Sequence, residues 1–276
     1  MGVRMMDLLS ANLAALRYEP TAKRIRVCLG GEPVADTRDA RLVWEPRRVV
    51  PTYAVPRAAL SAQLVPAGAE SGADEDVGVR LPAISSRPIL DPSVPFDAHS
   101  CSGTAYDVIA GGESGPAAAF RPDDPDLHDY VILEFNAFEW REEDEHIVSH
   151  PHDPFSRIDV LRSSRHVRVE LDGRLLAEST RPMLLFETLL PVRYYLPRED
   201  VVVRLEHSDT VTYCAYKGRA SYYSVPDGPR DVAWAYHEPL HDAEPVRDRI
   251  CFFDERVDVI VDGERRDRPV TPWSDA

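Results

Sequence analysis

Two stretches of the chain, KRIRVCLGGEPVADTRDARLVWE over residues 23–45 and RHVRVELDGRLLAESTRPMLLFE over residues 165–187, align with each other without a gap. After one deleted residue the alignment continues, with Tyr53–Arg57 matching Tyr194–Arg198. Self-similarity of this kind marks a repeated structural unit, so the sequence predicts a duplicated domain. The matched pairs are Arg26 and Arg168, Val27 and Val169, Leu29 and Leu171, Gly31 and Gly173, Ala35 and Ala177, Leu42 and Leu184, and Glu45 and Glu187.

Each copy opens with the alternation of a half-buried strand. In the second copy, Val167, Val169 and Leu171 alternate with polar residues, so they share one face of the predicted strand. Asp172 and Gly173 then supply the positive φ angles that a tight hairpin needs. The apolar residues that follow begin the returning strand.

The rest of the second copy also predicts strands. Its β-branched and aromatic runs are separated by Ser-Asp, Lys-Gly, Pro-Asp-Gly and Asp-Gly, which are turn sequences. Most of the 24 prolines lie between the runs, where a missing N–H does not disturb a sheet. The predicted fold class is therefore all-β, built of antiparallel sheets. The runs are Val201–Leu205, Val211–Tyr216, Ala220–Val225, Val232–Tyr236 and Ile250–Val261.

The repeat also predicts the domain organisation. We expect a first β domain over residues 1–145, a connector over 146–164 and a second β domain over 165–276. Within the first domain, residues 65–97 form a Pro-, Gly- and acid-rich insertion that is too polar to build a core. A short N-terminal helix is expected to pack on a sheet or a sheet edge, because apolar residues recur there at helical spacing. They are Met5, Leu8, Leu9, Leu13 and Leu16.

The composition disfavours several classes of protein. The 276 residues include 32 Lys and Arg against 47 Asp and Glu, a net charge of −15 at pH 7, and so acidic a chain disfavours nucleic acid as a partner. Without a run of about 18 apolar residues we expect neither a membrane span nor a signal peptide, and we expect a cytoplasmic protein. The four cysteines are widely spaced and lack a CxxC pair, so they indicate neither a zinc ribbon nor a disulfide framework.

A series of motifs runs through the second copy and the segment before it: 150–173, 186–188, 193–201, 214–223, 234–236 and 257–263. In this order they resemble the tandem form of the bacterial domain of unknown function number 427, a family also labelled nucleotidyltransferase domain. The resemblance implies a β-tent-like fold, in which two antiparallel sheets lean together over a pocket. The residues do not supply a convincing set for metal-dependent nucleotidyl transfer, which usually needs paired carboxylates, a phosphate-gripping Gly-Ser turn, or both.

Cationic and aromatic side chains gather in these motifs. Lys217 stands beside Gly218 in a hairpin-like turn, where its ammonium can meet a phosphate or carboxylate, or act as an amine if desolvation lowers its pKa. Arg193 and Arg198 can each grip an anion with two hydrogen bonds, and Glu187 can orient one of them. The rings that can stack on a flat ligand are Tyr195, Tyr222, Trp234 and Tyr236.

The first copy lacks parts of this set. Ser102 stands at the position of the lysine, and Ala118 is aligned with Trp234. A small-molecule site is therefore expected in the second copy, with the first as a scaffold or lid. A purely structural explanation also stays open, because aromatic rings fill β cores, Arg and Glu pair across strands, and Lys is common in turns.

Other groups are interpreted as structural, and no metal site is predicted. Cys214 is expected to be a buried thiol and not a nucleophile. The HxHD cluster is expected to cap and dock the connector between the two copies and not to bind a metal. The acidic pair near the C-terminus is explained by an ordinary Asp-Gly turn. These two groups are His150, His152 and Asp153, and Asp258 and Asp262.

The leading hypothesis is a small-molecule-binding β protein that recognises an anionic or nucleotide-like ligand in its second domain. A nucleotidyltransferase-like enzyme and a non-catalytic structural or protein-interaction module are the alternatives, and the sequence leaves the cofactor and any reaction open. The candidate ligand-binding residues are Glu187, Arg193, Tyr195, Arg198, Cys214, Lys217, Tyr222, Trp234 and Tyr236.

Overall fold

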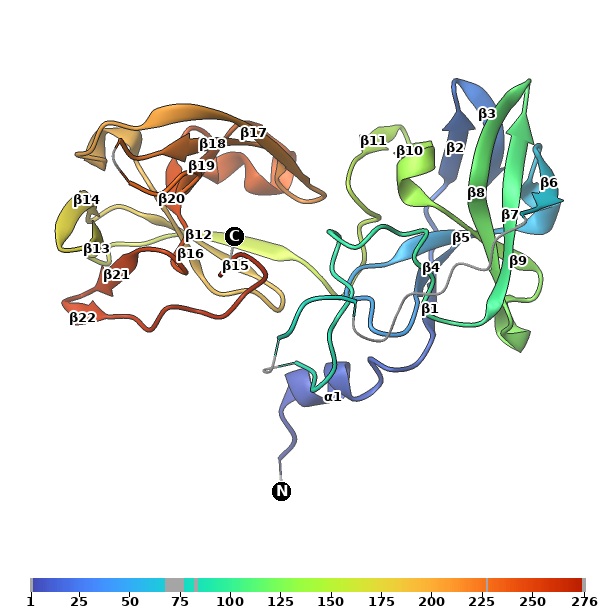
Figure 1. Cartoon of the computed structure of the whole chain (residues 1–276), viewed down its shortest axis with the longest axis horizontal. Coiled ribbons are helices and arrows are strands. Elements are labelled where there is room, and N and C mark those ends of the chain that lie inside the picture. Colours follow the sequence, from blue (N-terminus) through green and yellow to red (C-terminus); the bar gives the residue numbers. More distant parts are fainter. Residues whose placement is uncertain (1, 68–76, 82–83, 227, 275–276) are drawn as a thin grey trace. The chain divides into compact units, whose positions relative to one another are not determined.

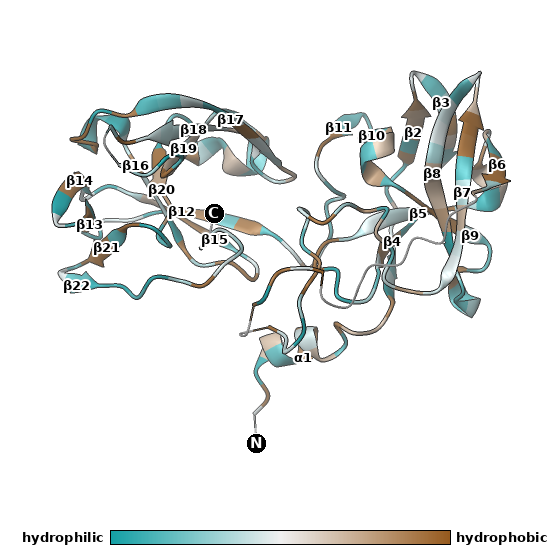
Figure 2. Ribbon diagram, viewed as in Figure 1, coloured by the Kyte–Doolittle hydropathy of each residue, from teal (hydrophilic) through white to brown (hydrophobic). Residues whose placement is uncertain are grey.

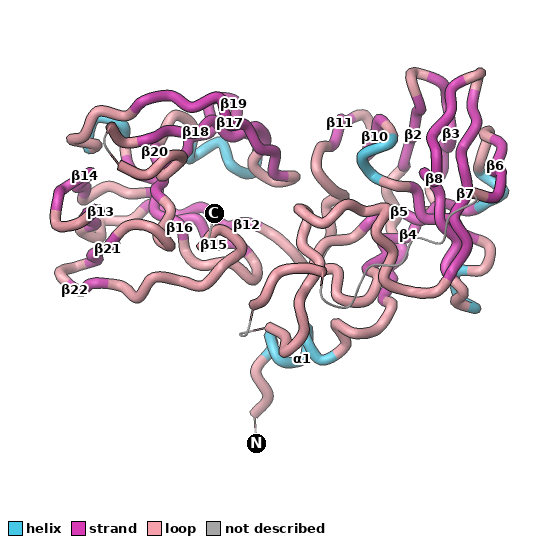
Figure 3. The backbone as a smooth tube through the Cα atoms, viewed as in Figure 1, coloured by secondary structure: helices cyan, strands magenta, loops and turns pink. Residues whose placement is uncertain are grey.

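The computed structural model describes residues 2–67, 77–81, 84–226 and 228–274. The chain divides into two compact units, Met1–Asp153 and Pro154–Ala276. Nearly all of the regular structure is strand, with short helical turns between strands (Figure 3). The prediction of an all-β fold is confirmed.

The first unit consists of two antiparallel sheets (Figure 1). A seven-stranded sheet has the order β1-β4-β5-β9-β8-β7-β6, and a four-stranded sheet has the order β11-β10-β2-β3. The strands are β1 Arg17–Pro20, β2 Ile25–Leu29, β3 Glu32–Thr37, β4 Arg41–Trp44, β5 Thr52–Pro56, β6 Gln63–Pro66, β7 Gly103–Ala110, β8 Glu113–Pro122, β9 Tyr130–Leu133, β10 Glu139–Glu142 and β11 Glu145–Ile147. The helices are α1 Met5–Ala11 and the 3-10 turns η1 Arg57–Ala59, η2 Pro125–Leu127 and η3 Phe135–Ala137.

The second unit has the same number of sheets and strands in its described residues. Its seven-stranded sheet has the order β12-β15-β16-β20-β19-β18-β17, and its four-stranded sheet has the order β14-β13-β21-β22. The strands are β12 Ile158–Arg162, β13 Val167–Leu171, β14 Arg174–Ser179, β15 Met183–Glu187, β16 Arg193–Leu196, β17 Glu206–Cys214, β18 Gly218–Ser224, β19 Ala233–Pro239, β20 Ile250–Phe252, β21 Asp258–Val261 and β22 Glu264–Arg265. The 3-10 turns are η4 Arg198–Asp200 and η5 His241–Val246.

The two units are built to one plan. Replacing β1 by β12, β4 by β15, β5 by β16 and so on along the chain turns one strand order into the other, in both sheets. The repeat seen in the sequence therefore covers a whole two-sheet topology, beyond the stretch that aligns without gaps. We refer to the units below as the first and second domains.

The predicted hairpin at the start of each copy is present. Asp172 and Gly173 have φ angles of 50° and 79°, and they join β13 to β14 in antiparallel register. Gly30 and Gly31 do the same between β2 and β3, with φ angles of 56° and 86°. Positive φ at both central residues matches the right-handed twist of the flanking strands. In Figure 2 the strand β2 is largely brown (hydrophobic), because four of its five residues are apolar and only Arg26 is polar.

Alternation along the strands of the second domain creates two separate apolar layers. Side chains between its two sheets form one layer, called here the intersheet core, which includes Val169, Tyr223 and Val259. The opposite face of the seven-stranded sheet carries the second layer, called here the aromatic cluster, which η5 covers with Ala243 and Val246. The rings of the aromatic cluster are Tyr195, Tyr222, Trp234, Tyr236, Phe253 and Trp273.

The N-terminal helix forms, but its predicted packing is wrong. None of the residues of α1 is buried, and Met5, Leu8 and Leu9 are exposed. Two of the predicted residues pack after the helix: Leu13 against Leu81 and Ile89, and Leu16 against the buried cluster that contains Phe120. The helix ends at Ala11, although the apolar spacing continues to Leu16. Across the described residues, no helix combines the length and the apolar character needed to cross a membrane.

Two other predictions are corrected by the backbone. The run Val201–Leu205 was predicted as a strand, but Val201 makes only an isolated bridge and β17 begins at Glu206. The 3-10 turn η4 directly before this run redirects the chain. In the expected connector, Ile158–Arg162 is the edge strand β12 of the second domain, paired with β15.

The expected insertion is in part well packed. Its acid-rich centre, residues 68–76, lies outside the described residues, as do residues 82–83. Of the remainder, Ile89 and Leu90 are buried, contrary to the expectation that this segment contributes no core. Arg48 is buried beside it and donates hydrogen bonds to the carbonyl oxygens of Val94, Pro95 and Ala98 at 2.5–2.9 Å. Backbone carbonyls thus organise a segment whose composition predicts a loop.

Candidate functional site

A buried ion pair joins Lys217 to Glu187 in the second domain. Lys217 ends the turn between β17 and β18, and its Nζ donates a hydrogen bond of 2.5 Å to Oε2 of Glu187 at the end of β15. The Lys217 side chain is only 9% exposed, against 17% for Glu187. Gly218 follows with a φ angle of 86°, which lets the turn close directly after the lysine. Sequence separation of 30 residues hides this pair from any local pattern.

Lys217 is held in its charged form at neutral pH. Burial opposes its charge, but interactions with Cys214, Glu187 and Tyr195 outweigh burial and raise the pKa of Lys217 above its ordinary value. The condition under which Lys217 would serve as a neutral amine, a pKa lowered by desolvation, is therefore not met. Glu187 pairs with this lysine. The expectation that Glu187 orients one of the two arginines is therefore corrected.

The predicted aromatic residues meet next to this pair. Trp234 Nε1 donates a hydrogen bond of 3.1 Å to the hydroxyl of Tyr195, and the two rings meet edge to face. Tyr236 lies beside Tyr195, with 6.4 Å between ring centroids. These three rings are buried and packed on one another, and burial raises the pKa of Tyr195 and Tyr236 well above the ordinary value. Only Tyr222 of the four predicted rings is partly exposed.

Cys214 and Tyr222 form the half-buried margin of the site. Cys214, at the end of β17, is half-buried and interacts electrostatically with Lys217 and with Tyr236. Tyr222 bonds Thr212 through its hydroxyl at 2.9 Å and stacks on Phe253.

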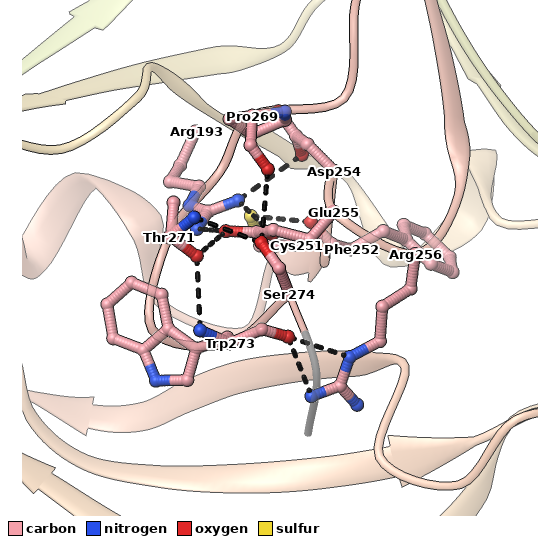
Figure 4. A network of polar contacts seen from close by, with 10 residues as sticks. All are labelled: Arg193, Cys251, Phe252, Asp254, Glu255, Arg256, Pro269, Thr271, Trp273 and Ser274. Atoms are coloured by element: carbon pink, nitrogen blue, oxygen red, sulfur yellow. Dashed lines mark hydrogen bonds and ion pairs between the residues drawn. The ribbon is translucent and has the colours of Figure 1, made fainter. Parts of the chain in front are cut away.

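Arg193 belongs to the same face but is already occupied. Its guanidinium donates two hydrogen bonds to Glu255, at 2.9 and 2.6 Å, and lies 3.7 Å from Asp254 (Figure 4). It also lies over the rings of Trp234 and Trp273, at 5.5 and 5.7 Å from their centroids. Burial opposes the charge of Arg193, but Glu255 and Asp254 outweigh it and raise its pKa. Arg193 therefore has no free bidentate edge for an outside anion.

The C-terminal segment completes this network. Thr271 Oγ1 donates a hydrogen bond of 2.5 Å to Glu255 (Figure 4). Trp273 packs toward Phe253. Burial raises the pKa of Asp254 to about 7, although Arg193 acts in the opposite direction. Glu255 is held ionised: burial works against it, but the bonds from Arg193 and Thr271 lower its pKa.

Arg198 lies elsewhere. It is exposed in η4, and its guanidinium stands 5.4 Å from the ring centroid of Tyr223, which belongs to the intersheet core. Trp234 and Tyr222 belong to the opposite face of the sheet. The expectation that Arg193 and Arg198 belong to one ligand site is corrected, because the two guanidinium groups lie on opposite faces of the sheet.

The structure thus divides the nine sequence-predicted residues into three groups. The first group is the margin with the ion pair, the second is packed interior and the third is remote. Members of the first are Glu187, Lys217, Cys214 and Tyr222, members of the second are Arg193, Tyr195, Trp234 and Tyr236, and the third is Arg198. Sequence reasoning missed Asp254, Glu255 and Trp273, although two adjacent acids directly after the apolar β20 run were a signal.

The first domain has a counterpart of the ion pair. Glu45, the equivalent of Glu187, is buried and bonds His99 Nδ1 at 2.8 Å and the Ser100 amide at 2.7 Å. The His99 ring stacks on Phe120 with 3.6 Å between centroids. The strand pairing makes Phe120 the counterpart of Trp234. Phe120 of β8 pairs with β9, which lies beside β5, and Trp234 of β19 pairs with β20, which lies beside the equivalent strand β16. The alignment of Ala118 with Trp234 is therefore corrected.

The remaining acidic and histidine candidates are occupied by structural contacts. Asp258 pairs with Arg265 and Arg268, and Asp262 accepts a hydrogen bond from the His166 amide. His150 is buried, with its Nδ1 2.9 Å from the Pro151 carbonyl oxygen. Within the described ranges, no group of three His, Cys, Asp or Glu side chains is placed to hold a metal ion.

The comparison with known families agrees with the internal repeat. A family model described as a domain of unknown function (DUF427) matches residues 17–75 and 159–263, which together cover more than half of the chain. The first segment begins with β1, and the second begins within its counterpart β12. No curated protein matches the chain. The two-segment match and the doubled two-sheet topology show that the chain belongs to the DUF427 family, in a tandem form.

Proposed function

We propose that the second domain binds a small anionic ligand, of the kind represented by a nucleotide or another phosphate ester, at the Lys217–Glu187 pair. The observation that carries this proposal is a lysine held as a cation at the half-buried margin of an aromatic cluster. Burying an ion pair costs desolvation free energy that a well-packed apolar pair would not incur. A role in recognition accounts for the retention of the pair, and perturbed ionisable groups concentrate at functional sites.

The chemistry of the margin favours an anion with an attached flat group. A phosphate or carboxylate can replace the Glu187 carboxylate on the Lys217 ammonium, which stays charged throughout. The half-buried ring of Tyr222 then offers a stacking surface for a base or other ring. Arg193 contributes indirectly, because its guanidinium lies over the ring of Trp234 and helps to hold that ring in place.

Binding of AMP and of inorganic pyrophosphate tests the proposal, with thermal shift and calorimetry as readouts. We expect Lys217→Met to weaken binding by about ten-fold or more, because a hydrogen bond to a charged group contributes about 1.5–3 kcal/mol. Lys217→Met alone leaves the Glu187 carboxylate without its partner, and the double variant Lys217→Met/Glu187→Gln removes that charge. A loss of binding seen in both variants therefore does not come from destabilisation by the unpaired carboxylate.

Lys23 provides the matched control. The chain has two lysines, and Lys23 is the other one. It lies in the first domain and also pairs with a carboxylate, that of Glu142. Lys23→Met should leave the binding of both probes unchanged. Failure of both probes to bind the wild-type protein, or equal binding by both lysine variants, would contradict the proposal.

A structural or protein-interaction module is a second candidate function, because three of the predicted rings are packed interior. Tyr195, Trp234 and Tyr236 already fill the space that a stacked ligand would need between them. If this candidate holds, Lys217→Met lowers the stability of the second domain and no probe binds either protein.

A further inference from the structure

Three side chains of the second domain form a continuous hydrogen-bonded chain. Asp248 Oδ1 lies 2.6 Å from Nδ1 of His237, and Nε2 of His237 lies 2.8 Å from the hydroxyl of Tyr223. Tyr223 is only 6% exposed, whereas the side chains of His237 and Asp248 are 45% and 63% exposed. The chain therefore leads from a buried phenol to the surface.

The acceptor at one end fixes the direction of the hydrogen bonds. An ionised carboxylate can only accept, so His237 donates its Nδ1 hydrogen to Asp248. In the neutral imidazole this leaves Nε2 as an acceptor, and the Tyr223 hydroxyl donates to it. A hydroxyl, a base within hydrogen-bond reach and a third group that orients the base form the arrangement that activates a nucleophile.

Charged and polar groups from η4, from β17 and from the residue after η5 contact these three residues. Arg198 from η4 stands over the Tyr223 ring, at 5.4 Å from its centroid. His207 from β17 meets the same ring edge to face. Arg247 donates a hydrogen bond of 2.7 Å to the His237 carbonyl oxygen and is itself paired with Glu244. Arg198 is the cation best placed to attract an anion toward the phenol, because no ion pair to it is formed within the described part of the chain.

We propose that Tyr223, His237 and Asp248 form an activated tyrosine that accepts an acyl group from an acyl phosphate. The Tyr223 oxygen attacks the acyl carbon, so that a new C–O bond forms and the C–O bond to phosphate breaks. The phenolic proton passes to His237 Nε2, Asp248 stabilises the resulting imidazolium, and the proton then leaves with the departing phosphate. Arg198 holds the phosphate in place during the transfer.

This site is independent of the proposed ligand site. Tyr223 lies in the intersheet core, and Tyr222, its neighbour in β18, lies in the aromatic cluster on the opposite face of the sheet. Neither proposal needs the other to be true. Lys23→Met, which alters only the first domain, should leave acylation of Tyr223 unchanged.

Acetylation of the wild-type chain by acetyl phosphate and by acetylimidazole, located by peptide mass spectrometry, tests the proposal. Tyr213 is the internal control: it is 57% exposed, and among the described residues no imidazole or carboxylate bonds its hydroxyl. Exposure alone would make Tyr213 react first. We expect Tyr223 to react faster with both donors, because a positioned base accelerates proton transfer by about 10²-fold or more. Competing acetylation of lysine amines should be slow, because the chain has two lysines and each is paired with a carboxylate.

Variants separate the base from the anion contact. His237→Gln should slow acetylation of Tyr223 by about ten-fold or more with both donors, and Asp248→Asn should act in the same direction. Arg198→Gln should slow only the reaction with acetyl phosphate, because acetylimidazole has no anionic leaving group. Faster labelling of Tyr213 than of Tyr223, or rates at Tyr223 that ignore His237→Gln, would overturn the proposal.

Discussion

Arg193→Met lowers the free energy of unfolding of the second domain by an expected 3–5 kcal/mol, about the cost of stranding buried charge. Glu255 would lose both guanidinium hydrogen bonds, and Asp254 would lose the cation 3.7 Å away. Thr271 would still donate to Glu255. Urea denaturation followed by alkylation of Cys251 measures the effect, since this thiol is fully buried in the same domain.

Two further variants separate burial from charge in this experiment. Arg181→Met removes an arginine from an exposed pair with Glu199 and Asp200, and such pairs contribute about 0–1 kcal/mol. The double variant Arg193→Met/Glu255→Leu should be more stable than Arg193→Met alone, because it removes a stranded carboxylate. A loss of about 1 kcal/mol or less for Arg193→Met would show that the pair contributes no more than a surface contact.

The stability of the second domain should fall as the pH rises from 5 to 8, because of Asp254. Burial raises the folded-state pKa of this carboxyl to about 7, while its ordinary value is 3.8. Between these values the folded protein binds a proton that the unfolded chain has released, so the free energy of unfolding decreases with pH. The full shift corresponds to about 4 kcal/mol, with little further change above the folded pKa.

Comparison with Asp254→Asn isolates this contribution from the other ionisable groups. The difference in unfolding free energy between wild type and Asp254→Asn should change steadily from pH 5 to about pH 7 and then level off toward pH 8 in urea denaturation. Asp200 is the control with the opposite sign: despite burial, bonds from Arg181 and Ser179 lower its pKa, so its contribution is lost only at acid pH. A wild-type curve parallel to that of Asp254→Asn over this range would refute the assignment.

Much of the fold could be predicted because strands and tight turns leave local signals. Alternation over Val167–Leu171 and the Asp172-Gly173 pair are enough to predict the hairpin of β13 and β14. The run Val201–Leu205 has the same β-branched composition but follows η4, and a 3-10 turn is not visible in a period-two pattern. Exposure of α1 also escaped prediction, because helical spacing indicates a face and not what covers it.

The candidate site was harder to predict because its pairs depend on register between distant strands. Lys217 could be singled out by its rarity, but its partner Glu187 comes from a strand that is not its neighbour in the sheet. Arg193 and Arg198 flank one short segment, yet Arg193 lies on the face of the aromatic cluster and Arg198 stands over Tyr223 of the intersheet core. Local motifs therefore identified reactive residue types but not their pairing.

The equivalence of Glu45 and Glu187 bears on how the halves of the protein diverged. Both acids close the same kind of strand, yet one meets an imidazole and the other an ammonium, and these bases enter from different points along the chain. The acid is thus the member that the two domains share, whereas the base that contacts it differs between them. Equivalent positions of one strand order therefore carry different local charge in the two domains.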